Sequence, residues 1–212
     1  MGRGIESLFP TPERLKLLEA VNEHERVWSS CRECELCEGR TRVVGHRGHP
    51  ARIMLVGEAP GEREDREGRP FVGSSGKLLD ELLHRAGMET THVFMTNVVA
   101  CRPPLNREPE REEMRACFRR IEGLVAIIRP RVLLLVGRVS ANKLAGVQSI
   151  TASRGQVMES IILDEEAGKL IPCVPTFHPS FLLRANDGAE RRRLEENVVD
   201  DFRTAKAVAA GE

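Results

Sequence analysis

The sequence predicts an α/β protein with a mostly parallel sheet that helices cover on both faces. Four short segments are almost wholly apolar, and each leads into a polar or Gly/Pro-rich stretch. Segments with apolar residues at helical spacing lie between them. Strands buried on both faces are continuous apolar runs, and their alternation with helices is typical of a parallel sheet.

The four apolar segments are the predicted strands, at 52–57 (RIMLVG), 93–99 (VFMTNVV), 132–136 (VLLLV) and 171–176 (IPCVPT). Helices are expected at 11–28, from Ser74, at 108–128, from Val139 and at 190–209. Thr11 would cap the first helix, with Pro12 as its first residue. The strands lead into GEAPGE, NVVACRPP, GRVS and TFHPS, so these four segments should converge at the carboxyl edge of the sheet, where such folds bind ligands.

Length and charge narrow the possibilities. A chain of 212 residues suits a single domain, which we expect to span residues 1–212. Its 32 basic residues balance 32 acidic ones, so any surface for nucleic acid must be local. The chain has no signal peptide and no apolar run of membrane-spanning length, which predicts a cytoplasmic protein without a membrane partner. Thiols stay reduced in the cytoplasm, so the six cysteines favour metal ligands or core residues over disulfides.

Five of the cysteines could form a metal site. Cys31, Cys34 and Cys37 lie within CRECELCEGRT, while Cys101 follows the second strand and Cys117 lies in a helix. A CxxC pair with two distant cysteines can bind zinc or an iron–sulfur cluster, and spacing does not choose between them. For Cys117, a place in the core is equally compatible. The sixth, Cys173, is expected in the core of the fourth strand.

The loop after the first strand reads GEAPGEREDREGRPFVGSSG. Its glycines allow the backbone to approach a ligand, and the helix that opens at Ser74 offers N–H groups to a phosphate. Glu58 is placed to act as a general base. Phe71 could anchor the core or stack on a flat ring. The charges from Glu62 to Arg69 are interpreted as a solvated surface loop.

The last segment at this edge reads TFHPSFLLR. His178 precedes a proline and could donate a hydrogen bond to a developing anion, or be a structural loop residue. The apolar run Phe181, Leu182 and Leu183 beside Arg184 could form a wedge into a base stack or a minor core contact.

Together these motifs resemble the family 4 uracil-DNA glycosylases, the iron–sulfur branch of the uracil-DNA glycosylase superfamily. The matching segments are GEAPGE–G–PFVG–G, TNVVACRPPLNREP, TFHPSFLLR, the CxxC–L–RT turn and Arg154-Gly155, in the family's order over residues 25–185. The resemblance implies a three-layer α/β/α sandwich around a four-stranded sheet. It also implies one [4Fe-4S] cluster, through which the N-terminal helix and cysteine turn (about 11–41) would pack on the domain. Counting back from Arg40, the implied ligands are Cys31, Cys34, Cys101 and Cys117, and Cys37 is not one.

The implied activity is base excision repair: hydrolysis of the bond between uracil and deoxyribose in single- or double-stranded DNA, by a monomer. Glu58 and His178 would be catalytic, and Ala59, Phe71 and Asn97 would bind the base. The implied DNA contacts are Gly73, Ser74, Ser75, Gly76, Ser180, Leu182, Leu183 and Arg184.

Two other functions remain open at this point. The first is a nucleic-acid-binding module stabilised by a metal cluster, without glycosylase activity. Zero net charge disfavours it, since non-specific affinity comes chiefly from phosphate neutralisation. The second is a zinc-stabilised nucleotide hydrolase, for which the carboxylate cluster of a catalytic metal is missing from the sequence.

Overall fold

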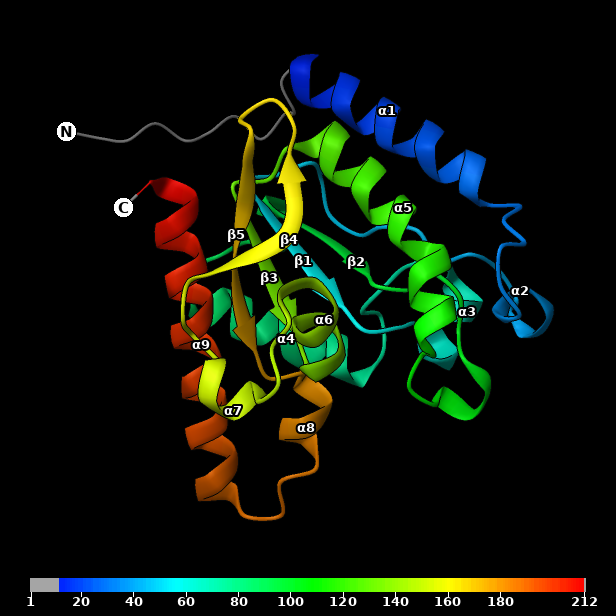
Figure 1. Cartoon of the computed structure of the whole chain (residues 1–212). Coiled ribbons are helices and arrows are strands. Elements are labelled where there is room, and N and C mark those ends of the chain that lie inside the picture. The colour runs from blue at the N-terminus through cyan, green and yellow to red at the C-terminus, as the bar shows by residue number, and fades with distance from the viewer. Residues whose placement is uncertain (1–11, 212) are drawn as a thin grey trace.

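A five-stranded sheet forms the centre of the protein in a computed structural model, which describes residues 12–211 (Figure 1). The strands are β1 (Ile53–Gly57), β2 (Val93–Asn97), β3 (Val132–Val136), β4 (Met158–Asp164) and β5 (Lys169–Thr176), in the order β2-β1-β3-β5-β4. The pairs β1–β2, β1–β3 and β3–β5 are parallel, and β4 runs antiparallel to β5 at one edge. All four predicted strands are present, and the parallel carboxyl ends meet at one edge as expected.

The expected strand count of four was wrong, because β4 was missed. Its burial alternates along the strand, with Glu159, Ile161 and Leu163 exposed and Ser160 and Ile162 buried. An antiparallel edge strand with one solvated face has no continuous apolar run, so the pattern used to find the other four does not detect it.

Helices cover both faces of the sheet. They are α1 (Pro12–Trp28), α2 (Leu36–Gly39), α3 (Glu62–Glu67), α4 (Ser74–Arg85), α5 (Arg111–Ile128), α6 (Arg138–Ala145), α7 (Ile150–Ser153), α8 (Pro179–Leu183) and α9 (Gly188–Ala210). Two 3₁₀ turns lie at Thr90–His92 and Pro104–Asn106. The start of α1 at Pro12 agrees with the sequence, while its expected cap, Thr11, lies outside the described residues.

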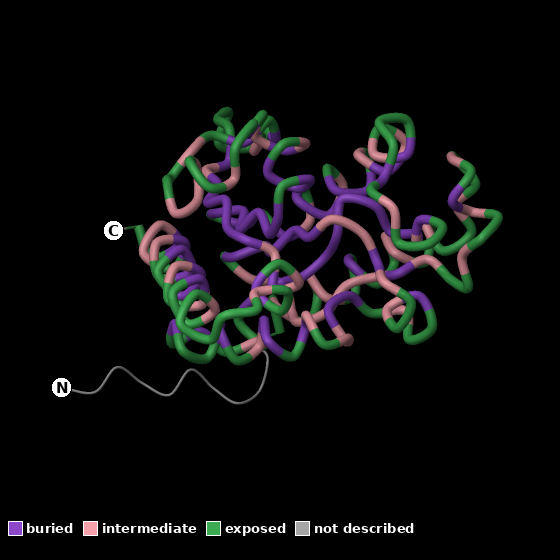
Figure 2. Tube along the Cα trace, turned by 90° about the horizontal axis from the view of Figure 1, so that it is seen from below, coloured by how far each residue is buried: buried purple, intermediate pink, exposed green. Residues whose placement is uncertain are grey.

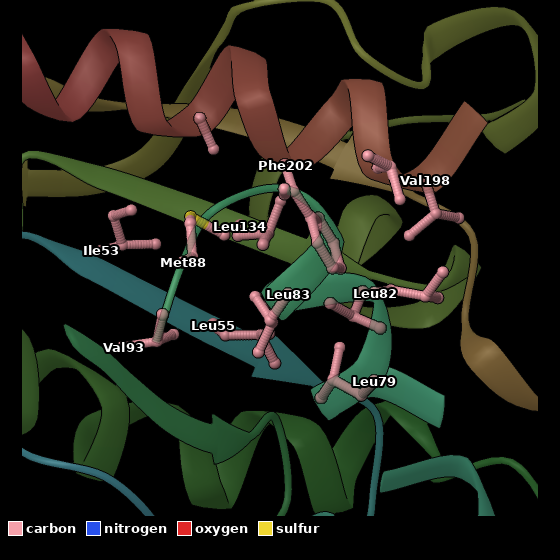
Figure 3. Packing of buried hydrophobic residues seen from close by; sticks show 14 of the residues in the cluster. Ile53, Leu55, Leu79, Leu82, Leu83, Met88, Val93, Leu134, Val198 and Phe202 are labelled. Carbon is pink, nitrogen blue, oxygen red and sulfur yellow. The ribbon is translucent and has the colours of Figure 1, made fainter. Parts of the chain in front are cut away.

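Alternate strand residues build a separate core on each face. Leu55 and Leu134 pack with Leu79 and Leu83 of α4 and Phe202 of α9 (Figure 3). Their neighbours Met54 and Leu133 point the other way, into a core with α1, α5 and α6. The strands are therefore buried from both sides, and exposed residues gather at the periphery (Figure 2). The predicted three-layer α/β/α sandwich is confirmed.

The N-terminal helix α1 lies along α5 (Figure 1). Val21 is buried there, and His24 Nε2 lies 3.1 Å from the Arg120 carbonyl oxygen. No helix within residues 12–211 is both long enough and apolar enough to cross a membrane.

Candidate functional site

A cleft of about 970 Å³ lies beyond the carboxyl ends of the four parallel strands. Segments following all four strands line it. Of the residues that the resemblance assigned to the site, ten line this cleft: Glu58, Ala59, Phe71, Gly73, Ser74, Ser75, Asn97, His178, Ser180 and Arg184. The predicted convergence at this edge is confirmed.

Gly57 brings two of these side chains together. The parallel register pairs Gly57 with Asn97, whose side chain is 4% exposed. A Cβ atom on Gly57 would lie 2.4 Å from Asn97 Oδ1 and 2.5 Å from Phe71 Cζ. The missing side chain at the end of β1 therefore makes room for an amide and an aromatic ring side by side.

Phe71 is held in an unusual backbone conformation. Its φ is 55°, in the left-handed region that side chains other than glycine rarely adopt. Arg47 Nη1 donates a hydrogen bond of 2.8 Å to the Phe71 carbonyl oxygen, and Arg47 Nη2 pairs with Asp80 at 2.6 Å. On the other side, a Cβ at Gly76 would lie 1.9 Å from the same oxygen. The Phe71 ring is thus fixed 6.3 Å from the His178 ring, measured between centroids.

His178 is a neutral hydrogen-bond donor in this setting. Burial, and then the charge of Arg184, lower the pKa of His178 to about 4, against a smaller opposite effect of Glu64. The backbone N–H of Ser180 donates to His178 Nδ1 at 3.1 Å. Since Nδ1 accepts that hydrogen, the neutral ring carries its proton on Nε2.

Glu58 follows β1 and lines the same cleft. Burial raises the pKa of its carboxyl, and the charge of Glu108 raises it further, while Arg138 has the opposite effect. Arg138 forms an ion pair with Glu108. A half-buried carboxylate with a raised pKa has the character of a base, although apolar surroundings alone can produce the same shift.

A buried network supports the segment that carries His178. Asp201 of α9 is fully buried, accepts a hydrogen bond of 2.6 Å from Thr176 Oγ1 and pairs with Arg154. Gly155 approaches the same carboxylate so closely that a Cβ would lie 2.5 Å from Asp201 Oδ1. The Arg154-Gly155 pair thus anchors the end of β5 just before Phe177 and His178.

Residues 62–69 are mostly helical where a loop was expected, and most of their charged side chains are exposed as predicted. They form α3 and its cap, and Asp65 is buried, where both carboxylate oxygens accept the Thr41 N–H at 3.0 Å. Glu64 lines the cleft and accepts the N–H groups of Val72 and Gly73 at 2.9 and 2.8 Å. This role of Glu64 could not be predicted, because in a sequence a glutamate that binds loop amides cannot be told from a glutamate exposed to solvent.

Two of the expected DNA contacts are buried. Leu182 is 0% exposed and packs in the core with α4 and α9, so it is not available to a DNA strand. Gly76 is buried against the Phe71 backbone, while Leu183 is exposed outside the residues that line the cleft. Phe181 lines the cleft with 43% of its surface exposed. The apolar run is helical (α8), so only one face of it can point outward, and a linear motif does not show which.

The cysteines form a second site, away from the cleft. Cys31, Cys34, Cys101 and Cys117 line one small cavity together with Arg40 and Arg120, and Cys37 does not line it. Arg40 Nη1 donates to Cys101 Sγ at 3.3 Å. Burial raises the pKa of Cys101 to about 11, against the lowering effect of Arg40. As expected, Cys173 is fully buried in the core.

Four cysteine thiols around one cavity are a donor set for a metal site. Within residues 12–211, no group of three or more His, Cys, Asp or Glu side chains is arranged to hold a single metal ion. Four thiolates can bind zinc or an iron–sulfur cluster.

Comparison with known proteins agrees with the family resemblance of the sequence. Residues 45–203 match the model of the uracil DNA glycosylase superfamily. A type-4 uracil-DNA glycosylase from Sulfurisphaera tokodaii is 43% identical, covering 85% of this chain and 80% of the relative. Those from Thermotoga maritima and Archaeoglobus fulgidus are 41% and 37% identical, covering 92% and 88% of this chain and 95% and 92% of the relatives. The chain belongs to the uracil-DNA glycosylase superfamily.

Proposed function

We propose that this protein is a type-4 uracil-DNA glycosylase, which hydrolyses the bond between uracil and deoxyribose in DNA and leaves an abasic site. The observation that carries the proposal is His178, a neutral imidazole with its proton on Nε2, in a cleft that also holds Phe71, Asn97 and Glu58. The similarity to three type-4 enzymes over most of the chain supports it.

Recognition begins with the base outside the helical stack. A target base must leave the stack to reach a pocket, which costs a few kcal/mol, roughly, for unstacking and unpairing. The Phe71 ring would stack on the uracil face, and the Asn97 amide would pair with its polar edge, using one donor and one acceptor. Ala59 lines the same cleft. Both side chains pack closely against the backbone of Gly57, so we expect them to hold the same positions before uracil binds.

The bond that breaks joins N1 of uracil to C1′ of the sugar. The electron pair leaves with uracil as an anion, and the sugar takes on oxocarbenium character. His178 Nε2–H would donate to the uracil oxygen on which this charge develops. Ionised Glu58 would stabilise the positive sugar and accept a proton from the water whose oxygen adds to C1′. One water is consumed, and uracil and an abasic sugar are released.

DNA would lie along the mouth of the cleft. The amides at the start of α4, at Ser74 and Ser75 after Gly73, suit a phosphate, and Ser180 and Arg184 add a hydroxyl and a charge. Phe181, partly exposed beside them, takes the role of wedge that Leu182 cannot fill. These contacts do not depend on a second strand, so we propose activity on both single- and double-stranded DNA, by a monomer.

Cys31, Cys34, Cys101 and Cys117 would hold one [4Fe-4S] cluster. When bound, the cluster cross-links the N-terminal turn to the loop after β2 and to α5. The chemistry of uracil release is carried by the cleft residues alone. Free thiols suit a reducing compartment, so we place the protein in the cytoplasm, acting as one domain with its N-terminal segment packed on it.

The test is incubation with an oligonucleotide that contains one uracil, followed by alkali. We expect cleavage at the uracil position and no cleavage of a thymine control. His178→Ala should lower the single-turnover rate by about 10²–10³-fold, as for the loss of one donor to a developing anion. If the iron-loaded protein binds the oligonucleotide but leaves uracil in place, the glycosylase function is refuted in favour of a binding module.

A further inference from the structure

Arg120 of α5 is the largest fully buried side chain in the described part of the protein, 1% exposed. Its Nη2 atom is well partnered: it donates to Thr96 Oγ1 at 3.0 Å and lies 3.6 Å from Glu25 Oε1. Glu25 in turn pairs with His46 at 2.8 Å. The guanidinium therefore links α1, α5 and β2.

The other two nitrogens of Arg120 have no partner. Nε and Nη1 are buried and make no hydrogen bond to any described residue. An unpartnered donor in the interior costs about 1–3 kcal/mol, and more when it carries charge. Buried donors of native proteins are nearly always satisfied, so this pair of N–H groups points to a ligand.

The position of Arg120 identifies that ligand. It lines the cavity of the four cysteines and lies three residues after Cys117 on α5, which places both on one side of the helix. Nη1 lies on the far side of the guanidinium from Nη2, so with Nη2 turned to Thr96 the side that carries Nη1 is left for the cavity.

We propose that Arg120 is the buried cation of the cysteine site: its unpartnered Nη1–H donates to a sulfur atom of the cluster held by Cys31, Cys34, Cys101 and Cys117. This inference rests on the cluster assignment in the proposed function. Arg40, which donates to Cys101 Sγ, supplies a second and less buried cation to the same four sulfurs.

Two properties follow for the bound cluster. Four thiolates and the sulfides of a cluster carry net negative charge, which a buried site must compensate. Hydrogen bonds and a positive charge stabilise the reduced, more negative state, so Arg120 raises the reduction potential. They also hold the thiolates in place, so Arg120 slows the loss of iron.

Arg120 also connects the cysteine site to the cleft. Thr96, which accepts from Nη2, directly precedes Asn97 in β2. A shift of the Arg120 guanidinium would move Thr96 and, through the backbone of β2, Asn97, which we assign to the polar edge of uracil. Arg120 is therefore a positioning residue for Asn97, and it does not touch the substrate.

The experiment compares Arg120→Met, which keeps the volume and removes the charge, with Arg120→Lys, which keeps the charge and loses the planar donors. We expect the reduction potential of the cluster, from titration followed by electron paramagnetic resonance, to be lowered in Arg120→Met and less so in Arg120→Lys. Release of iron to a chelator should be about tenfold faster in Arg120→Met. If Arg120→Met does not fold, the potential and iron release of Arg120→Lys decide.

Arg154→Met is the control, because Arg154 is a partly buried arginine that pairs with Asp201 on the opposite face of the sheet. It should lower the melting temperature and leave the potential and iron release unchanged. The proposal is overturned if both Arg120 variants match the wild type in these two measurements, or if Arg154→Met changes them equally. A wild-type protein without iron would overturn the cluster assignment itself. The uracil-excision assay tests the glycosylase activity separately.

Discussion

At the scale of single residues, the proposed mechanism needs both Glu58 and His178 in their deprotonated forms. Glu58 would act as an ionised carboxylate, and burial raises its pKa above the usual 4.5. His178 would act as a neutral ring, and its pKa is lowered to about 4. Both are in the active form above the pKa of Glu58, so that carboxyl, and not the histidine, sets the acid limit of activity.

We therefore expect the single-turnover rate of uracil release to rise with pH through the raised pKa of Glu58 and to level off by neutral pH. Glu58→Gln should lower the plateau and remove this rise. The remaining acid limit should then lie near pH 4, where His178 becomes protonated. Protonated Nδ1 can no longer accept the hydrogen bond from the Ser180 N–H. An unchanged acid limit in Glu58→Gln would show that another group titrates.

The sequence predicted these residues because each is a polar or aromatic side chain at the end of an apolar strand. It could not predict Arg47, Glu64 or Arg120, which act by holding other residues. Arg47 fixes the Phe71 carbonyl from 24 positions away, and Arg120 reaches Thr96 across the same distance in sequence. Such partners depend on the packing of segments that are distant in sequence, and a linear pattern contains no record of it.

At the scale of elements, the end of β1 determines the geometry of the pocket. In Gly57→Ala the new methyl group would lie 2.4 Å from Asn97 Oδ1 and 2.5 Å from Phe71 Cζ, so both side chains must move. We expect uracil release to fall by about 10²-fold, as for small misplacements of reacting groups. The fold should persist, because the displaced groups line the cleft. Single-turnover rates and melting temperatures measure the two effects.

Gly188→Ala is the control for this substitution. At the start of α9, its Cβ would meet only the Arg192 side chain, at an ordinary distance of 3.7 Å. Its rate should equal that of the wild type. If Gly57→Ala is equally active, Phe71 and Asn97 do not need the close packing at the end of β1.

Elements with one continuous pattern were the predictable ones. The strand at 132–136 has the expected bounds and the helix from Ser74 the expected start, because their apolar residues follow a single period. The edge strand β4 was missed because its burial alternates, and the short helix α3 was missed because it is rich in charge. The burial of Asp65 inside α3 depends on the distant Thr41, which local pattern does not report.

At the scale of the whole molecule, the cysteine site joins segments that the sheet alone would not hold. Residues 29–44 contain two of the four cysteines and only one short helix, α2. Helix α1 also packs on α5 through Val21 and His24, so it has contacts of its own. The segment between α1 and β1 would therefore depend most on the proposed cluster.

Cys34→Ser and Cys37→Ser are a matched pair from this one turn, and they test that dependence. Cys34→Ser should lose iron and lower the free energy of unfolding by on the order of 4 kcal/mol, the entropic contribution of closing a loop of this length. Hydrogen exchange should speed up in residues 29–44, while β1 and β3 stay protected. Cys37→Ser should keep the iron and the wild-type exchange pattern, because Cys37 does not line the cavity. Iron loss in both variants would move the CxxC ligand pair to Cys34 and Cys37.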